Sequence, residues 1–244
     1  EVTDCEAIAY LEPLLKDGFI HLLSFMNHTP GQGQFKEIES FKNFFGKFYK
    51  RSDRELEKII ERKISLKDSV KSNINCLARI CKNLNIPMAS HDDDTIEKVN
   101  FIKEIGISIS EFPVNMDVVK ALKNNGIYVC LGAPNILRGR SHTNNLSARE
   151  TIACGYGDII CSDYSPMTIL HSIFTLYKNN IVSLSEAVNM TSLNPAKAVG
   201  ISDKTGSIEE GKEADLILVD TSFEVPRIWK TFVSGKEVYS MSLD

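Results

Sequence analysis

The 244-residue sequence lacks the features that mark several classes of protein. No apolar run approaches the roughly 18 residues that a membrane-spanning helix requires, so no span and no membrane partner are predicted. The formal net charge is only −4, which gives no reason to expect an extended surface for nucleic acid or lipid. An anionic ligand must therefore be held by local Lys, Arg or His side chains.

Paired cysteines are absent as well. Six cysteines are present, but none forms a C-x-x-C pair, and several lie inside apolar runs such as Tyr128–Leu131. Buried, reduced thiols in a cytoplasmic protein are the simplest interpretation. The first residues, Glu-Val-Thr-Asp-Cys, include neither Met nor a charged-then-apolar signal pattern, and are typical of the middle of a domain.

Short apolar segments alternate with helical patterns along the first two-thirds of the chain. The expected strands are Phe19–Met26, Ile86–Ala89, Ile107–Ser110, Ile127–Leu131 and Asp158–Cys161. The helical patterns are Cys5–Lys16, Arg51–Asn83, Asp94–Ile105, Met116–Asn124 and Ser147–Cys154. This alternation predicts βα units around a parallel sheet, and continuous apolar runs are typical of strands buried on both faces.

The other segments follow different patterns. Residues 31–50 contain no clear strand and are expected to form an excursion over the mouth of a barrel. The expected helices after Asp163 are Pro166–Lys178 and Leu184–Val199, and the expected short strands are Gly206–Ile208, Ala214–Val219 and Trp229–Tyr239.

Polar side chains follow the predicted strands where each strand ends. His28, His91, Glu111 and Asp163 each come just after one of them. In a β/α barrel the active site lies at the carboxyl ends of the strands, so residues far apart in sequence can share one ion there. Imidazole and carboxylate groups suit Zn²⁺, Mn²⁺ or Fe²⁺. The spacing alone leaves a metal centre and ordinary surface positions both open.

The carboxylates of residues 92–94 have a simpler explanation. Carboxylates at the start of a helix favour its dipole and can cap its free amides, so we expect these three to cap the helix that follows. The alternative is that one of them orients His91.

Two basic segments are candidates for anion binding. Arg138-Gly139-Arg140-Ser141-His142 combines guanidinium groups, which match phosphate geometry, with a glycine that lets backbone amides approach. Lys47, Lys50 and Arg51 form a second cluster. A solvated loop and a solvated helix face remain the alternatives.

Three C-terminal motifs resemble the amidohydrolase superfamily. Thr191–Gly200 resembles the helix after the last barrel strand, Gly206–Asp220 the return into a small β-sandwich, and Val233–Tyr239 its closing strand. The resemblance implies an α/β fold: an incomplete TIM-like (β/α) barrel over residues 1–200 and part of a small β-sandwich over residues 201–244.

Motifs in the middle of the chain resemble one branch of that superfamily, which belongs to phosphonate metabolism by the carbon–phosphorus lyase pathway. The motifs are Met26–Gln32, Ser90–Asp93, Glu111–Pro113, Gly132–Asn135, Arg138–His142 and Ser162–Tyr164. This branch implies hydrolysis of α-D-ribose 1-methylphosphonate 5-triphosphate to the 5-phosphate and pyrophosphate. It also implies one or two divalent ions, with Zn first and Mn or Fe as alternatives.

The resemblance assigns roles to individual residues. Asp163 is expected to bind metal and to shuttle the proton of the attacking water, and His91 to be a metal ligand. His28 is expected to be a ligand or a substrate contact, and Glu1 a carboxylate that could bridge two ions, while Glu111 stands where relatives often place a histidine. The substrate contacts expected from the branch are Arg138, Arg140, His142, Asn135 and Lys47.

One departure from the superfamily pattern is large. No His-x-His or His-Thr-Asp motif of a first barrel strand is present, so we expect an N-terminally truncated member without the opening strands. Unpaired strand edges then predict a homo-oligomer. A cyclic-amide hydrolase or deaminase of the same superfamily, and an inert subunit that acts only in assembly, are the alternative functions.

Overall fold

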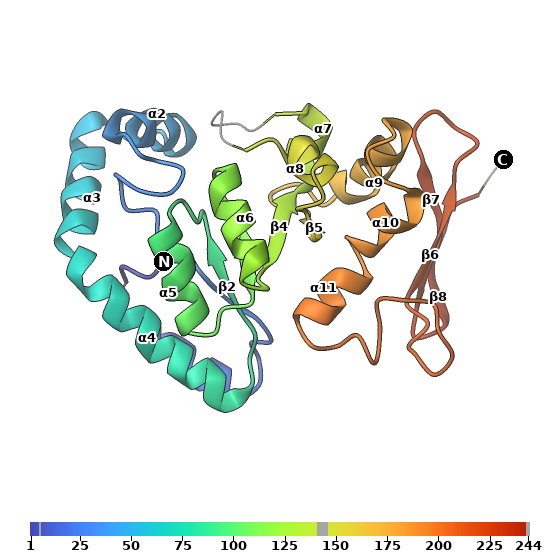
Figure 1. Ribbon diagram of the computed structural model, residues 1–244, viewed down its shortest axis with the longest axis horizontal. Helices are drawn as coiled ribbons and strands as arrows, with labels where there is room; N and C mark the ends of the chain where they lie inside the picture. Colours follow the sequence, from blue (N-terminus) through green and yellow to red (C-terminus); the bar gives the residue numbers. More distant parts are fainter. Residues whose placement is uncertain (5, 141–145, 243–244) are drawn as a thin grey trace. The chain divides into compact units, whose positions relative to one another are not determined.

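The structure is a computed structural model that describes residues 1–4, 6–140 and 146–242, apart from the side chains of residues 47–49. The chain divides into two compact units, Glu1–Val129 and Cys130–Asp244. Figure 1 shows the helices and strands of each unit.

Three parallel strands form the sheet of the first unit. They are β1 (Leu23–Phe25), β2 (Met88–His91) and β3 (Ile109–Glu111), and their register pairs Leu23 with Met88 and His91 with Glu111. The strands are mostly buried because apolar residues occupy both faces, as expected for parallel strands covered by helices. The register brings the ends of β2 and β3 to the same edge.

The helices of the first unit connect or follow these strands. They are α1 (Ala7–Lys16), α2 (Ile38–Tyr49), α3 (Asp53–Ser65), α4 (Lys67–Leu84), α5 (Ile96–Glu104) and α6 (Met116–Asn124). Gly106 and Gly126 follow α5 and α6 with φ of +78° and +70°, the left-handed conformation expected between helix and strand.

One sequence expectation for this unit was incomplete and another was wrong in detail. Residues 31–50 contain no named strand, as expected, but they also contain α2, whose Ile38, Phe41 and Phe45 recur at helical spacing. The expected helix 51–83 is two helices, because the chain turns at Leu66, where the backbone N–H bonds to the carbonyls of Arg62 and Ile64.

The second unit combines parallel and antiparallel strands. The unit boundary falls within strand β4 (Tyr128–Gly132), whose residues Cys130–Gly132 pair in parallel with β5 (Ile159–Cys161). At the C-terminal end, β6 (Leu216–Asp220), β7 (Arg227–Val233) and β8 (Lys236–Ser240) form an antiparallel sheet in that order. The fold class is therefore α/β with parallel strands and a small separate antiparallel sheet.

The helices of the second unit are short. They are α7 (Ala133–Arg138), α8 (Ala148–Ala153), α9 (Thr168–Lys178), α10 (Leu184–Asn189) and α11 (Leu193–Ala198). Helices α10 and α11 replace the single helix expected over Leu184–Val199. The strand expected over 206–208 does not form, and the single strand expected over 229–239 is a hairpin that turns at Ser234-Gly235. Over the described residues, every helix is too short or too polar to cross a lipid bilayer. The predicted domain boundary at residue 200 remains a prediction.

Candidate metal centre

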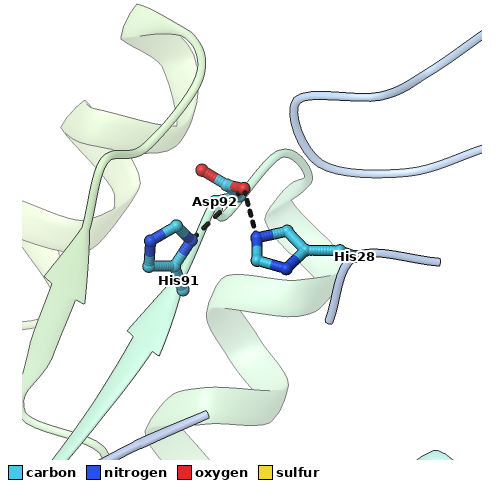
Figure 2. Close-up of side chains that lie close together, drawn as sticks. All are labelled: His28, His91 and Asp92. Atoms are coloured by element: carbon cyan, nitrogen blue, oxygen red, sulfur yellow. Dashed lines mark ion pairs between the residues drawn. The ribbon is translucent and has the colours of Figure 1, made fainter. Parts of the chain in front are cut away.

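Three side chains converge at the carboxyl end of β2. One ligand atom each from His28, His91 and Asp92 lies within 4.8 Å of the other two. Asp92 Oδ2 is 3.2 Å from His91 Nδ1 and 3.7 Å from His28 Nε2. Figure 2 shows both imidazole rings turned toward this carboxylate, which lies in the turn after β2.

The local backbone explains why these groups meet. Strand β2 ends at His91, and Asp92 adopts a left-handed conformation with φ of +53°, so its side chain turns back over the strand end. The Asp92 N–H donates to the Glu111 carbonyl at 2.9 Å, which ties the turn to β3. On the other side, Asn27 accepts hydrogen bonds from the backbone and hydroxyl of Thr29, and this turn fixes the backbone around His28.

The polar atoms of this group fit a divalent cation. His91 Nδ1 and Asp92 Oδ2 are both buried and make no hydrogen bond, since their approach at 3.2 Å lacks hydrogen-bond geometry. Buried polar atoms without hydrogen-bond partners are costly, because they have given up their hydrogen bonds to water. Two imidazoles and a carboxylate are a usual donor set for Zn²⁺, Mn²⁺ or Fe²⁺, and an ion bound by all three would satisfy both orphaned atoms.

Glu1 contacts the far side of the His28 ring. Its Oε1 is 2.6 Å from His28 Nδ1, and its Oε2 is 3.2 Å from Lys63 Nζ. Burial raises the pKa of Glu1, but the hydrogen bond with His28 and the charge of Lys63 outweigh it and lower the pKa to about 2. A carboxylate on one ring nitrogen fixes the other as a metal ligand. Where Glu1 was expected to bridge ions, its contacts are those of a residue that orients His28.

Glu111 lies beside His91 on the neighbouring strand but is bonded elsewhere. Its Oε2 accepts a hydrogen bond from Ser24 on β1, and it is not part of the three-residue group. Burial lowers the pKa of His91, but the Asp92 carboxylate, with a smaller contribution from Glu111, outweighs it, so the pKa lies above its usual value. Glu111 therefore adds negative charge near the group.

The expectation that residues 92–94 cap the next helix was wrong. Thr95 is the N-cap of α5, where its hydroxyl accepts from the Lys98 N–H. Asp93 is fully buried and accepts hydrogen bonds from Ser90 and Ser110, while Asp94 accepts the Gly33 N–H at 2.8 Å. The three carboxylates thus face the strand ends and the loop after β1, and Asp92 joins the candidate metal centre.

The remaining expected site residues belong to the second unit or lie outside the described part. Asp163 is exposed, with φ of +51°, two residues after β5. Arg138 and Arg140 are exposed, and Arg138 donates to the Tyr164 hydroxyl. His142 and the side chain of Lys47 lie outside the described residues.

The side chain of Asn135, which was expected to contact the substrate, makes hydrogen bonds within the chain. Its amide donates to the Leu146 carbonyl at 3.0 Å and its oxygen accepts the Ala148 N–H at 3.1 Å. Both ends of the side chain are thus engaged in holding the segment before α8.

Two lysines near the candidate metal centre were not predicted from the sequence. Lys98 Nζ lies 2.8 Å from the His91 carbonyl and 3.1 Å from the Asp93 carboxylate, so it clamps the turn that carries Asp92. Lys63 neutralises Glu1 from α3. Asp93 and Lys98 are five residues apart, and Glu1 and Lys63 are 62 residues apart, so neither pair has the i,i+3 or i,i+4 spacing that predicts a contact on a helix.

Comparison with known proteins places the chain in a family. Residues 32–238 match the amidohydrolase family. The chain is 34% identical over 234 residues to the α-D-ribose 1-methylphosphonate 5-triphosphate diphosphatase of Escherichia coli K12, covering 93% of this chain and 61% of that protein. It is also 26% identical over 181 residues to the imidazolonepropionase of Thermoplasma volcanium, covering 69% of this chain and 39% of that one. The chain thus spans less than two-thirds of these relatives.

Solved structures share the fold. The N-acetylglucosamine-6-phosphate deacetylase of Pasteurella multocida superposes with a TM-score of 0.59 at 15% identity, over 96% of this chain and 73% of that one. An amidohydrolase from Thermotoga maritima superposes with a TM-score of 0.53 at 19% identity, over 85% of this chain and 54% of that one. With the family match over most of its length and a relative at 34% identity, the chain belongs to the amidohydrolase family.

Proposed function

We propose that this protein is a metal-dependent hydrolase that cleaves α-D-ribose 1-methylphosphonate 5-triphosphate to the 5-phosphate and pyrophosphate in phosphonate catabolism. The observation that carries the proposal is the group of His28, His91 and Asp92, in which two buried polar atoms have no hydrogen-bond partner. The relative at 34% identity supports the choice of substrate. A cytoplasmic location and a homo-oligomeric state, both expected from the sequence, are part of the same proposal.

The residues of the first unit would hold one divalent ion. His28 Nε2, His91 Nδ1 and Asp92 Oδ2 are the donor atoms, Glu1 keeps the His28 ring in place, and Lys98 keeps the turn of Asp92 in place. A bound ion supplies hydroxide at neutral pH by lowering the pKa of water to about 7. Zn is the first choice and Mn or Fe are the alternatives, and a second ion held with Glu1, Glu111 or Asp163 belongs to the proposal.

Residues of the second unit would transfer the proton and offset the negative charge of the polyphosphate. Asp163 would accept the proton of the attacking water and return it to the leaving pyrophosphate oxygen, as general acid–base chemistry requires. Arg138, Arg140 and His142, with Lys47 from the first unit, would offset the negative charge of the triphosphate. Water adds to the sugar-proximal phosphorus, and the bond to the pyrophosphate oxygen breaks.

Pyrophosphate release from the triphosphate by the metal-loaded protein tests this function. We expect Asp163→Asn to remove most of the turnover while the far-ultraviolet circular dichroism stays unchanged. Near-normal pyrophosphate release by the Asp163→Asn variant would refute the role of Asp163. A protein that carries metal but releases no pyrophosphate would refute the proposed substrate.

A second candidate is hydrolysis of a cyclic amide or deamination, which the imidazolonepropionase relatives favour. Both chemistries would use the same residues to hold a metal ion, so these residues do not distinguish the two candidates. Formation of a ring-opened product or of ammonia, without pyrophosphate, would support this candidate. Binding of less than about half an equivalent of Zn, Mn or Fe would instead favour an inert subunit that acts in assembly.

A further inference from the structure

A pocket of about 540 Å³ opens beside the candidate metal centre within the first unit. Glu1 and His28 form one part of its wall, and helices α2 and α3 form most of the rest. The volume falls in the range of small-molecule sites. Arg51 belongs to the basic cluster that the sequence offers as a candidate for anion binding, and it also lines this pocket.

One wall of the pocket is apolar and aromatic. Phe41, Phe44 and Phe45 line it from α2, and their rings pack on one another and on Phe35 with centroid distances of 4.4 to 5.5 Å. Phe41 is buried, whereas Phe44 is 43% exposed. A large apolar side chain that remains exposed inside a concave site is a ready contact for the apolar part of a ligand.

Another part of the wall, formed by α3 and the residues before it, carries positive charge. Lys63 follows Leu56 and Ile59 along one face of α3, and all three line the pocket together with Arg51. Lys63 uses one of its three donors on Glu1, at 3.2 Å, and Arg51 uses Nη1 on Glu55, at 3.1 Å. Both cations therefore keep donors for a ligand. Glu1 is the one acidic residue of the lining, and Lys63 and His28 offset its charge.

The two helices are held together independently of any ligand. Lys42 on α2 pairs with Glu57 on α3 at 3.1 Å, and Ser52 and Glu55 form a capping box at the start of α3. Leu56 and Ile60 are buried. The phenylalanines and the cations thus face one pocket from a preformed wall, which reduces the cost of ordering side chains on binding.

We propose that this pocket binds the organophosphorus end of the substrate, an anionic phosphonate group whose oxygens contact Lys63 and Arg51 while its carbon substituent packs on Phe44 and its neighbours. The choice of substrate rests on the proposed function, and the pocket's chemistry itself rests on the lining residues. A group that combines an anion with an apolar substituent uses both walls, whereas inorganic phosphate uses only the cations. The pocket is then a specificity site next to the reacting centre.

Calorimetric titration of the protein with phenylphosphonate, methylphosphonate and inorganic phosphate tests the pocket. The titration is run with a chelator present, so that the metal group cannot bind the probes. We expect phenylphosphonate to bind at least about tenfold more tightly than phosphate, because its ring leaves water. Phe44→Ser should remove this preference, and Phe19→Ser, which alters an equally apolar but exposed residue outside the pocket, should preserve it. Equal affinity of the unaltered protein for phenylphosphonate and phosphate would overturn the proposed contact between the carbon substituent and Phe44.

Substitutions on α3 test the proposed contact between the phosphonate oxygens and Lys63. We expect Lys63→Met to lower the affinity for all three probes by about tenfold or more. Lys63→Arg, which keeps the positive charge, should retain most of the affinity. Lys58→Met alters an exposed lysine on the same helix and should leave the affinity unchanged. With the triphosphate substrate, Lys63→Met should raise KM with little change in kcat. Unaltered probe affinity in a folded Lys63→Met protein would overturn the proposal.

The two proposals fail in different ways. If pyrophosphate is released and Lys63→Met leaves KM unchanged, the reaction stands and the pocket is not its specificity site. If the probes bind with the expected dependence on Lys63 and Phe44 but no pyrophosphate is released, the phosphonate pocket stands and the proposed reaction is refuted.

Discussion

At the residue scale, Oδ2 of Asp92 is the atom on which the candidate metal centre depends, because it lies between the two imidazole rings. It is 3.2 Å from His91 Nδ1 and 3.7 Å from His28 Nε2, in a residue that is 5% exposed. A buried carboxylate between two histidines without hydrogen-bond geometry is costly unless a cation binds there. The Asp92 side chain should therefore contribute strongly to metal affinity.

We predict that Asp92→Asn weakens Mn²⁺ binding by at least about tenfold, because it removes the negative charge from the group while keeping its size. Equilibrium dialysis of the purified protein measures the affinity. Asp117→Asn alters an exposed carboxylate in the first turn of α6 and should leave the affinity unchanged. Equal Mn²⁺ affinity of the Asp92→Asn and unaltered proteins would exclude Asp92 as a ligand.

The sequence predicted only part of this centre. His28 and His91 could be identified because each follows an apolar segment, and barrel geometry brings strand ends together. Asp92 was assigned to helix capping, since the order His-Asp-Asp-Asp-Thr does not show that Thr95 takes the cap. Contacts such as that of Lys63 with Glu1 join residues 62 positions apart, and no local pattern encodes them.

At the element scale, the turn between β2 and α5 is held by Lys98. Its ammonium contacts the carbonyls of His91 and Asp92 and the fully buried carboxylate of Asp93. We predict that Lys98→Met lowers the free energy of unfolding by about 3 kcal/mol, because it leaves Asp93 buried without a counter-charge. Urea denaturation measures the loss. Lys103→Met, which alters an exposed lysine later in α5, is the control, and equal stabilities of the two variants would contradict the clamp.

The loop between β1 and α2 is fitted closely to the same turn. Gly33 has φ of +59°, its N–H donates to Asp94, and a Cβ there would meet the Asp92 Cβ at 3.2 Å. Gly33→Ala should therefore lower stability by about 1 kcal/mol through backbone strain and, in addition, weaken Mn²⁺ binding by displacing Asp92. Gly18→Ala has similar strain, with φ of +74°, but open space around it. If both variants bind Mn²⁺ alike, the loop does not position Asp92.

The bounds of helices and strands were predicted well where the burial of an apolar segment determines the element. The βα alternation placed both ends of β2, β3, β4 and β5 within two residues and placed α5 and α6 equally closely. Strand β1 covers only three of the eight residues expected, because only Leu23–Phe25 pair with β2. The break at Leu66 and the helix α2 depend on packing between helices, which a residue-by-residue pattern does not contain.

At the scale of the whole molecule, two cysteines, one in each unit, differ in how accessible their thiols are. Cys81 lies on α4 in the first unit and is fully buried, and burial raises the pKa of its thiol to about 11. Cys154 lies in the second unit and is exposed. The thiolate is the reactive form, so at pH 8 the Cys81 thiol is protected both by burial and by protonation.

We predict that iodoacetamide labels Cys154 of the native protein readily and reaches Cys81 only when the first unit opens. A ligand that binds only the folded unit stabilises it by about 2.7 kcal/mol at 100 times its Kd. Mn²⁺ at that concentration should therefore slow Cys81 labelling by up to about 100-fold and leave Cys154 labelling unchanged, as measured by mass spectrometry of tryptic peptides. The protection should largely disappear in Asp92→Asn. Protection of Cys81 by Mn²⁺ that persists undiminished in that variant would show that the ion binds elsewhere in the first unit.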